Sequence, residues 1–333
     1  MKKIWALLPA LFCAAAIWLN VDALALEVEE LIPVGDAVGI EIKMGGVLVA
    51  EAGQLETASG KASPARDAGI CPGDIIISVN GRKVATAAEF LTEAAKFDGS
   101  PVNLTIKRNG REIAFSVQPA CTSDGSFQLG LWLRDGVCGM GTVTFYDPES
   151  GVYGALGHGI NDLKTGELVP LGSGSILDSE VTEIVQGKAG CPGELRGAID
   201  KAHVLGSIES NSICGIFGHA SSAEFSLRSP LPVAAPEELV LGDASILCTV
   251  SGETKEYAVE ICRIYRASDE LRSMLLCVRD PELLSLTGGI VQGMSGSPII
   301  QDGKLVGAVT HVLVNDPTRG YGIFIENMLD AAG

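Results

Sequence analysis

The sequence contains few histidines, few aromatic residues and few basic residues. Only 4 of its 333 residues are histidine, aromatic residues make up 5%, and 24 Lys and Arg stand against 41 Asp and Glu. The net charge of -17 argues against nucleic acid as a partner, because an acidic surface repels phosphates. No two cysteines have the CxxC spacing, which argues against a structural zinc site.

Glycine, in contrast, is abundant, with 41 residues that separate many short apolar runs. From Phe127 onward, apolar and polar residues alternate in short segments. Residues 246–250 and 257–264 flank a Gly-Glu-Thr-Lys turn, and residues 298–300 and 305–310 flank Asp302-Gly303. Such hairpin patterns predict a mainly β domain, either a barrel or a sandwich.

The amino-terminal segment has the pattern of an export signal. Lys2 and Lys3 precede an apolar run that begins at Ile4, and Ala23-Leu24-Ala25 fits a cleavage site. We therefore expect residues 1–26 to be a signal peptide or a retained membrane anchor, and the body of the protein to be exported. Residues 27–36 then read as a short linker.

Residues 37–120 form a predicted α+β unit. A short helix ends near Gly69, a strand follows Gly73-Asp74, and residues 87–96 have the apolar spacing of an amphipathic helix. The Ser-Pro-Ala-x-x-Ala-Gly-Ile, Gly-Asp-x-Ile and Val-Asn-Gly patterns resemble a PDZ domain of the bacterial protease type. The resemblance implies a groove that binds an extended peptide. By the same resemblance, its binding loop would comprise Gly39, Ile40, Glu41 and Ile42. The alternative is a PDZ-shaped spacer without a ligand.

The segment from Gly293 to Pro298 has the pattern of a serine nucleophile. Ser295 lies between Met294 and Gly296, where a tight turn can expose its hydroxyl. The backbone N–H groups of Gly293 and Ser295 can then point at a developing oxyanion. Ser297 reads as a residue that stabilises the loop, and Pro298 argues against the strand-to-helix turn of an α/β-hydrolase esterase.

A serine nucleophile needs a base, and histidine is the usual one. His158 is the best candidate because it follows a predicted strand and lies between two glycines, whereas His219 is the second choice. Asp280 is the candidate for the third member of a triad, although an Asp-Pro pair is often only a turn, and Asp162 is an alternative. Such a site requires no metal or organic cofactor. A cysteine nucleophile at Cys214 is less favoured.

The carboxyl third, with the segments around Thr142–Pro148 and Tyr153–His158, resembles the stage IV sporulation protein B (SpoIVB) peptidase family. The order of anchor, PDZ domain and peptidase domain matches as well. The resemblance implies a chymotrypsin-like double β-barrel over residues 121–333, with Ser295 as nucleophile, His158 as base and Asp280 as acid.

The resemblance also implies a role in endospore formation. Family members are exported into the space between the forespore and mother cell membranes. There they cleave a membrane-bound regulator of an intramembrane metalloprotease, and themselves, so that pro-sigma-K is processed. The alternative is a catalytically inactive, membrane-tethered PDZ scaffold.

The eight cysteines beyond residue 13 leave the disulfide pairing open.

Overall fold

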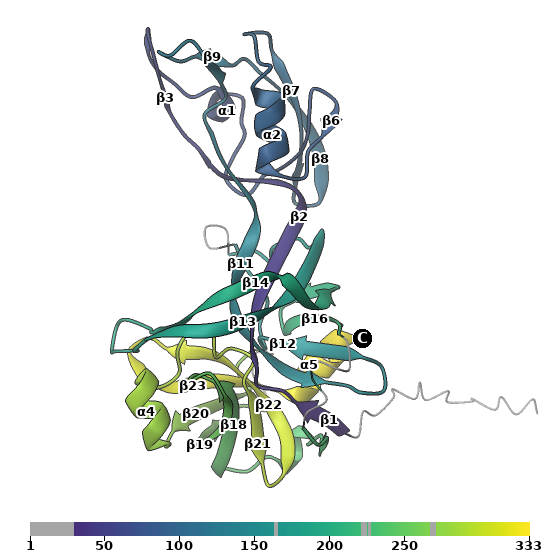
Figure 1. Ribbon diagram of the computed structural model, residues 1–333, viewed down its shortest axis with the longest axis vertical. Coiled ribbons are helices and arrows are strands. Elements are labelled where there is room, and N and C mark those ends of the chain that lie inside the picture. Colours follow the sequence, from purple (N-terminus) through teal and green to yellow (C-terminus); the bar gives the residue numbers. More distant parts are fainter. Residues whose placement is uncertain (1–29, 163–165, 221–224, 226–227, 267–270) are drawn as a thin grey trace, which may run out of the picture.

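The computed structural model is mainly β (Figure 1). A small α+β unit lies above a larger β unit in this view. The structure describes residues 30–162, 166–220, 225, 228–266 and 271–333. The predicted mainly β fold class is confirmed, with the α+β unit inserted within the larger β unit along the chain. We call them the PDZ unit and the peptidase unit after the domains predicted from the sequence. Within the described residues, no helix has the length and apolar character needed to cross a bilayer. The predicted amino-terminal segment 1–26 lies outside the described residues.

The PDZ unit packs helices on a small sheet. Its helices are α1 (Pro64–Asp67) and α2 (Ala87–Ala94). Its strands are β3 (Leu55–Thr57), β4 (Gly60–Ala62), β5 (Ile75–Val79), β6 (Arg82–Lys83), β7 (Val102–Arg108), β8 (Arg111–Val117), β9 (Ala120–Cys121) and β10 (Phe127–Gln128). Helix α2 starts where the Thr86 side chain accepts a hydrogen bond from the Glu89 N–H, at 3.2 Å, and it buries Phe90 in the core.

One lobe of the peptidase unit is an open sheet. Its strands are β1 (Glu30–Pro33), β2 (Ala37–Ala52), β11 (Leu131–Tyr146), β12 (Val152–Ala155), β13 (Ser173–Val185), β14 (Glu194–Ile208), β15 (Ser210–Ser212), β16 (Gly215–His219) and β17 (Leu231–Pro232). Strand β1 pairs with β11 and β17 and buries Leu31 and Ile32. The linker predicted over residues 27–36 is therefore wrong from Glu30 onward, because these apolar residues find partners far away in the sequence.

Two long strands join the PDZ unit to this lobe. The first part of β2 pairs with β11 and β13, and Val47 and Leu48 of the same strand pair with β5 of the PDZ unit. Strand β11 runs beside β2 through both units (Figure 1). The boundary between the units therefore lies within two continuous strands, and the peptidase unit includes chain from both sides of the PDZ unit.

The other lobe is a closed barrel with the strand order β18-β19-β20-β23-β22-β21. Its strands are β18 (Gly242–Thr249), β19 (Thr254–Ile264), β20 (Met274–Val278), β21 (Pro298–Gln301), β22 (Lys304–Leu313) and β23 (Asp316–Phe324). Around it lie η1 (Pro236–Glu238), α4 (Pro281–Thr287) and α5 (Ile325–Ala332). A disulfide between Cys262 and Cys277 links β19 to β20. Cys214 and Cys248 are free and buried, whereas Cys71, Cys121, Cys138 and Cys191 are free and exposed.

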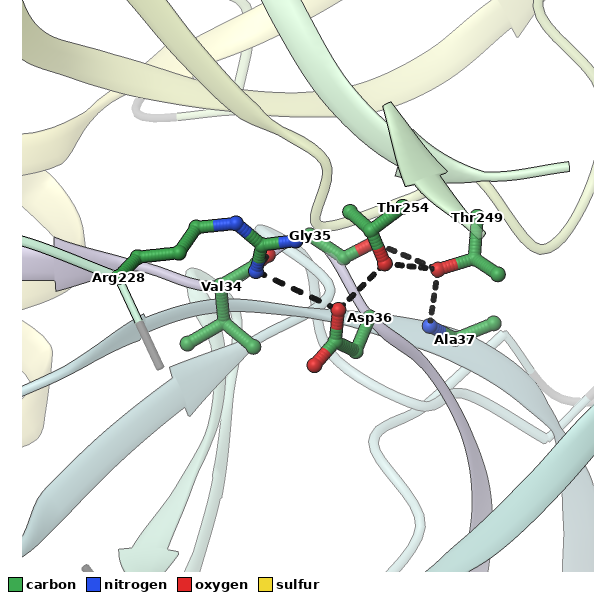
Figure 2. A network of polar contacts seen from close by, with 7 residues as sticks. All are labelled: Val34, Gly35, Asp36, Ala37, Arg228, Thr249 and Thr254. Atoms are coloured by element: carbon green, nitrogen blue, oxygen red, sulfur yellow. Dashed lines mark hydrogen bonds and ion pairs between the residues drawn. The ribbon is translucent and has the colours of Figure 1, made fainter. Parts of the chain in front are cut away.

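A polar network joins the two lobes (Figure 2). Asp36, in the turn between β1 and β2, accepts hydrogen bonds from Arg228 and from the Thr254 hydroxyl at the start of β19. The Thr249 hydroxyl lies 2.6 Å from that of Thr254 and accepts a hydrogen bond from the Ala37 N–H at 3.2 Å. This contact, which we call the seam network, fixes the start of β2 against the barrel.

Candidate active site

Ser295 lies in the loop that connects α4 to β21 of the closed barrel. Its side chain is partly exposed, and its Oγ donates a hydrogen bond to the carbonyl oxygen of Thr310 on β22, at 2.7 Å. Ser297, the other hydroxyl of the loop, has no exposed surface. Only Ser295 of these two serines is therefore accessible to a substrate, in agreement with the preference for it in the sequence.

Gly296 allows the serine loop to pack directly on the backbone of the open sheet. A Cβ atom there would lie 2.0 Å from the carbonyl oxygen of Thr142 and 2.5 Å from the nitrogen of Leu156. The residue also has a φ of +97°, which favours glycine. Any side chain at this position would push the serine loop away from the segment that leads to His158.

Two backbone N–H groups of the serine loop have no hydrogen-bond acceptor among the residues that the structure describes. They belong to Gly293 and Ser295, the pair predicted to form an oxyanion hole. The N–H groups between and beside them are all paired: Gln292 with Gly193, Met294 with Val291, Gly296 with Val309. An anionic oxygen of a substrate would satisfy both of them.

His158 follows a strained turn at the end of β12. The Gly157 N–H donates to the Ala155 carbonyl at 3.0 Å, which closes a γ-turn around Leu156, whose φ is +72°. A bulky residue with positive φ is unfavourable and persists only where its surroundings hold it. Here Leu156 is buried, and its N–H donates to the Thr142 carbonyl at 3.1 Å.

The hydrogen bond of the His158 ring sets its tautomer. Nδ1 lies 2.9 Å from the carbonyl oxygen of Gly159. Because a carbonyl can only accept, Nδ1 carries the proton of the neutral ring and Nε2 keeps the lone pair that a general base needs. Burial lowers the pKa of His158 below its ordinary value, and the Gly159 carbonyl offsets only part of this effect. The ring is therefore neutral at physiological pH.

His311 brings the two predicted residues into one place. It directly follows Thr310, which accepts the Ser295 hydrogen bond, and its ring centroid lies 4.8 Å from that of His158. Loss of hydration, the neighbouring His158 and Arg272 together lower the pKa of His311 to about 4, although its side chain reaches the solvent. The site thus combines a serine hydroxyl with two neutral imidazoles.

Asp280 has a different role from the one predicted. It is the N-cap of α4, where its Oδ1 accepts hydrogen bonds from the N–H groups of Glu282 and Leu283 at 2.9 and 3.0 Å. In the strand register, Leu275 on β20 is level with Tyr321 on β23 and with His311 on β22. Val278, two residues before Asp280, lies three residues further along β20, roughly 10 Å beyond that level. Strand β23 also separates β20 from β22.

The structure therefore does not bring Asp280 to the imidazole, which corrects the predicted third member of the triad. The Gly159 carbonyl takes the place of the acid on Nδ1 of His158. Asp280 instead fits the alternative role of an Asp-Pro pair, in which the aspartate forms hydrogen bonds with the neighbouring backbone.

The other candidates lie elsewhere. His219 pairs with Glu209 at 3.0 Å and His203 with Asp178 at 3.2 Å, both on the exposed surface. The backbone N–H of Asp162 bonds to the Glu167 carbonyl in a turn, and Cys214 is buried. Within the described part of the chain, no group of three or more His, Cys, Asp and Glu side chains is placed to hold a metal ion.

The residues predicted to bind a PDZ ligand lie in the peptidase sheet. Gly39, Ile40, Glu41 and Ile42 pair with β11 along one edge of β2 and with β13 along the other. Both edges are occupied, so no peptide strand can be added there, and this prediction is wrong. A groove of about 370 Å³ lies instead between α2 and residues 126–131. It is lined mainly by apolar side chains, among them Phe90, Leu91, Phe97, Phe127 and Leu129.

Comparison with known families decides the identity of the chain. The description of the SpoIVB peptidase S55 family matches residues 125–329, and that of the PDZ domain matches residues 38–118. The chain belongs to the SpoIVB peptidase S55 family. It is a serine peptidase with a PDZ domain.

Individual relatives of this family member match over short segments. The putative zinc metalloprotease CPE1693 of Clostridium perfringens is 36% identical over 69 residues, which cover 21% of each protein. The serine protease HTRA1 of Xenopus tropicalis is 39% identical over 57 residues, 17% of this chain and 12% of that protein. The crystal structure of the inactive form of Rv3671c protease matches 59% of this chain and 85% of its own at 15% identity, with a TM-score of 0.35.

Sequence reasoning missed three contributors to the site of this peptidase. They are the Gly159 carbonyl, the γ-turn at Leu156 and the buried side chain of Thr142. The glycines on both sides of His158 gave a signal that the backbone there is unusual. No local pattern marks Thr142, because the partner of its side chain, the Gly293 carbonyl, lies 151 positions away in the sequence.

Proposed function

We propose that this member of the family is an exported serine endopeptidase in which Ser295 is the nucleophile and His158 the general base. The observation that carries the proposal is the pair of unpaired N–H groups at Gly293 and Ser295, next to a partly exposed hydroxyl and a neutral imidazole. Together these groups supply the nucleophile, the proton acceptor and the oxyanion site of acyl transfer.

The proposed reaction starts with a rotation of the Ser295 side chain. Its hydroxyl leaves the Thr310 carbonyl, turns to His158, and gives its proton to Nε2 as the oxygen attacks the peptide carbonyl. The new oxyanion accepts hydrogen bonds from Gly293 and Ser295. The imidazolium then protonates the leaving amine, and water releases the acyl group by the same steps. The Gly159 carbonyl holds the ring in position throughout.

We further propose that the substrate is a membrane-bound regulator of an intramembrane metalloprotease in the forming endospore, and that the chain also cleaves itself. The support is family membership together with a PDZ groove that suits an extended peptide. The apolar lining of the groove favours a ligand with apolar side chains. Export into the space between the two membranes, by the segment 1–26, belongs to the same proposal.

A fluorophosphonate labelling experiment tests the proposed nucleophile. The wild type should be labelled at Ser295, and Ser295→Ala should lose both the label and the cleavage of itself or of a candidate substrate. Ser297→Ala is the matched control, because that hydroxyl is buried in the same loop. If Ser295→Ala cleaves as fast as the wild type, the assignment is refuted, and the alternative of an inactive PDZ scaffold gains support if the wild type takes no label.

A further inference from the structure

Thr142 on β11 contacts both halves of the site and reaches them from one buried position. Its side chain is almost fully buried, at 1% exposure, and its Oγ1 donates a hydrogen bond to the Gly293 carbonyl at 2.8 Å. Its N–H donates to the Ser295 carbonyl at 3.0 Å, and its own carbonyl accepts from Leu156 at 3.1 Å. One residue thus ties the serine loop to the turn that precedes His158.

The hydroxyl of Thr142 restricts a part of the loop that would otherwise rotate easily. Gly293 has no Cβ atom and a φ of +98°, so the peptide planes on its two sides have little steric resistance to rotation. The plane before it is held where the Leu195 N–H on β14 donates to the Gln292 carbonyl at 2.8 Å. The plane after it is held by the Thr142 hydroxyl on the Gly293 carbonyl.

These two anchors determine where the free N–H groups point. In a trans peptide the C=O and N–H groups point in opposite directions, so holding the Gln292 carbonyl aims the Gly293 N–H. Holding the Gly293 carbonyl fixes the path of the chain into Met294 and so the position of the Ser295 N–H. An oxyanion site accelerates the reaction only if its donors are already aligned before the charge develops.

We infer that Thr142 is a positioning residue for the oxyanion site, and that its hydroxyl acts by holding the Gly293 carbonyl. The inference rests on the proposed role of Ser295. Removing an oxyanion donor directly costs a hundredfold to a thousandfold in rate, and loss of an anchor one step away should cost less, roughly tenfold to a hundredfold. The effect should fall on the chemical step rather than on binding, because Thr142 is buried.

The chain offers a matched control two positions along the same strand. Thr144 is also fully buried, and its Oγ1 has no hydrogen-bond partner among the residues that the structure describes. Thr142→Val and Thr144→Val remove the same atom from the same strand and replace it with the same methyl group. They differ in whether that atom holds the serine loop.

The experiment measures phosphonylation of the full-length chain by a fluorophosphonate. In this reaction the Ser295 oxygen forms a bond to phosphorus, fluoride leaves with the electron pair of the P–F bond, and the serine proton passes to His158. The limiting rate at saturating probe and the probe concentration for half of that rate are determined separately for each variant. Thermal unfolding shows whether each variant is folded.

Thr142→Val should lower the limiting rate at least about tenfold and leave the half-saturating concentration unchanged. Thr142→Ser, which keeps the hydroxyl, and Thr144→Val should both react within about threefold of the wild type. If Thr142→Val does not fold, Thr142→Ser is compared with Thr142→Ala, since these differ in the hydroxyl alone. Equal limiting rates with and without the hydroxyl would overturn the inference, while an unlabelled wild type would overturn the proposed function itself.

Discussion

The two lobes of the peptidase unit differ in how their sheets end. The barrel, which carries Ser295, closes on itself through β18 and β21, so all its strands find partners within one segment of chain. The sheet that carries His158 stays open, and two of its strands, β2 and β11, continue into the PDZ unit. The proposed nucleophile therefore lies on the closed lobe, and the proposed base lies on the lobe that is physically continuous with the PDZ unit.

The serine loop on the barrel and the turn before His158 on the open sheet both contain residues with positive φ, but different residue types adopt this conformation in the two places. The serine loop uses glycine where φ is positive, at Gly293 and Gly296, which costs little. The histidine loop uses Leu156, where the same conformation is held by burial and by Thr142. The position of the proposed base thus depends on packing that holds a strained residue, whereas the serine loop needs no strained side chain and is held by hydrogen bonds from Thr142 and Leu195.

Loss of the proposed base on the open lobe is expected to have the largest effect on the reaction of Ser295 on the closed lobe. His158→Ala should lower the rate of phosphonylation at Ser295 by at least about a thousandfold, because no other group takes the serine proton as readily. His219→Ala, on the exposed surface beside Glu209, is the control and should react like the wild type. A rate for His158→Ala within threefold of the wild type would show that His158 is not the base and that the open lobe supplies no proton acceptor.

The pH dependence should be the next largest effect, and above pH 4.5 it reports mainly on His158, because the pKa of the neighbouring His311 is about 4. Protonation of His158 removes its lone pair, so the rate falls about tenfold per unit once the pH is below its pKa. Burial lowers that pKa from the ordinary value of 6.5, so half of the maximal rate should be reached below pH 6.5. Rates of phosphonylation between pH 4.5 and 8 measure this midpoint, and a midpoint above 7 would show that loss of hydration does not lower the pKa of His158.

Substitution of Asp280 should affect the stability of the barrel and leave the chemistry unchanged. Asp280→Ala removes the N-cap of α4 and should cost about 1 kcal/mol of unfolding free energy, whereas Asp280→Asn keeps a capping oxygen and should cost much less. Denaturant unfolding and phosphonylation rates are measured on the same samples. A triad role would be restored if Asp280→Asn lost activity by orders of magnitude while it stayed folded.

The seam network should give the smallest effect. Asp36→Asn removes one charge from the contact between the lobes but keeps its shape, and both Asp36 and Arg228 are partly exposed. We expect a loss of less than about 1 kcal/mol that becomes smaller at high salt. Melting temperatures at low and high ionic strength measure it. Glu56→Gln, in an exposed pair with Lys61 of the PDZ unit, is the control, and an equal response of both variants would show that the seam charge has no special role.

Much of the fold was predictable from local patterns in the sequence. Glycine turns located the hairpins β18–β19 and β21–β22, and apolar spacing located α2. The serine loop was also a local signal, since its glycines and its hydroxyl are neighbours in the chain. Such features depend on residues a few positions apart, and the structure agrees with them.

The failed predictions all depend on contacts between distant segments. Residues 30–33 read as part of a linker because their partner strand, β11, begins at Leu131. Gly39–Ile42 read as a binding loop because nothing nearby reveals that β13 covers their second edge. The partner of Nδ1 in His158 is a backbone carbonyl, which leaves no trace in residue identity. In the same way, Asp280 reads as a candidate acid until the strand register places it away from the imidazole.

The entry of β2 between β11 and β13 has a practical consequence for work with this protein. A fragment cut at residue 121 would lack the central strand Ala37–Lys43 and would expose the facing edges of both neighbours. Unpaired edges of this kind invite aggregation. The peptidase unit should therefore be produced with β1 and the first part of β2 attached. A shortened version would have to replace the PDZ unit by a tight connection from β2 to β11.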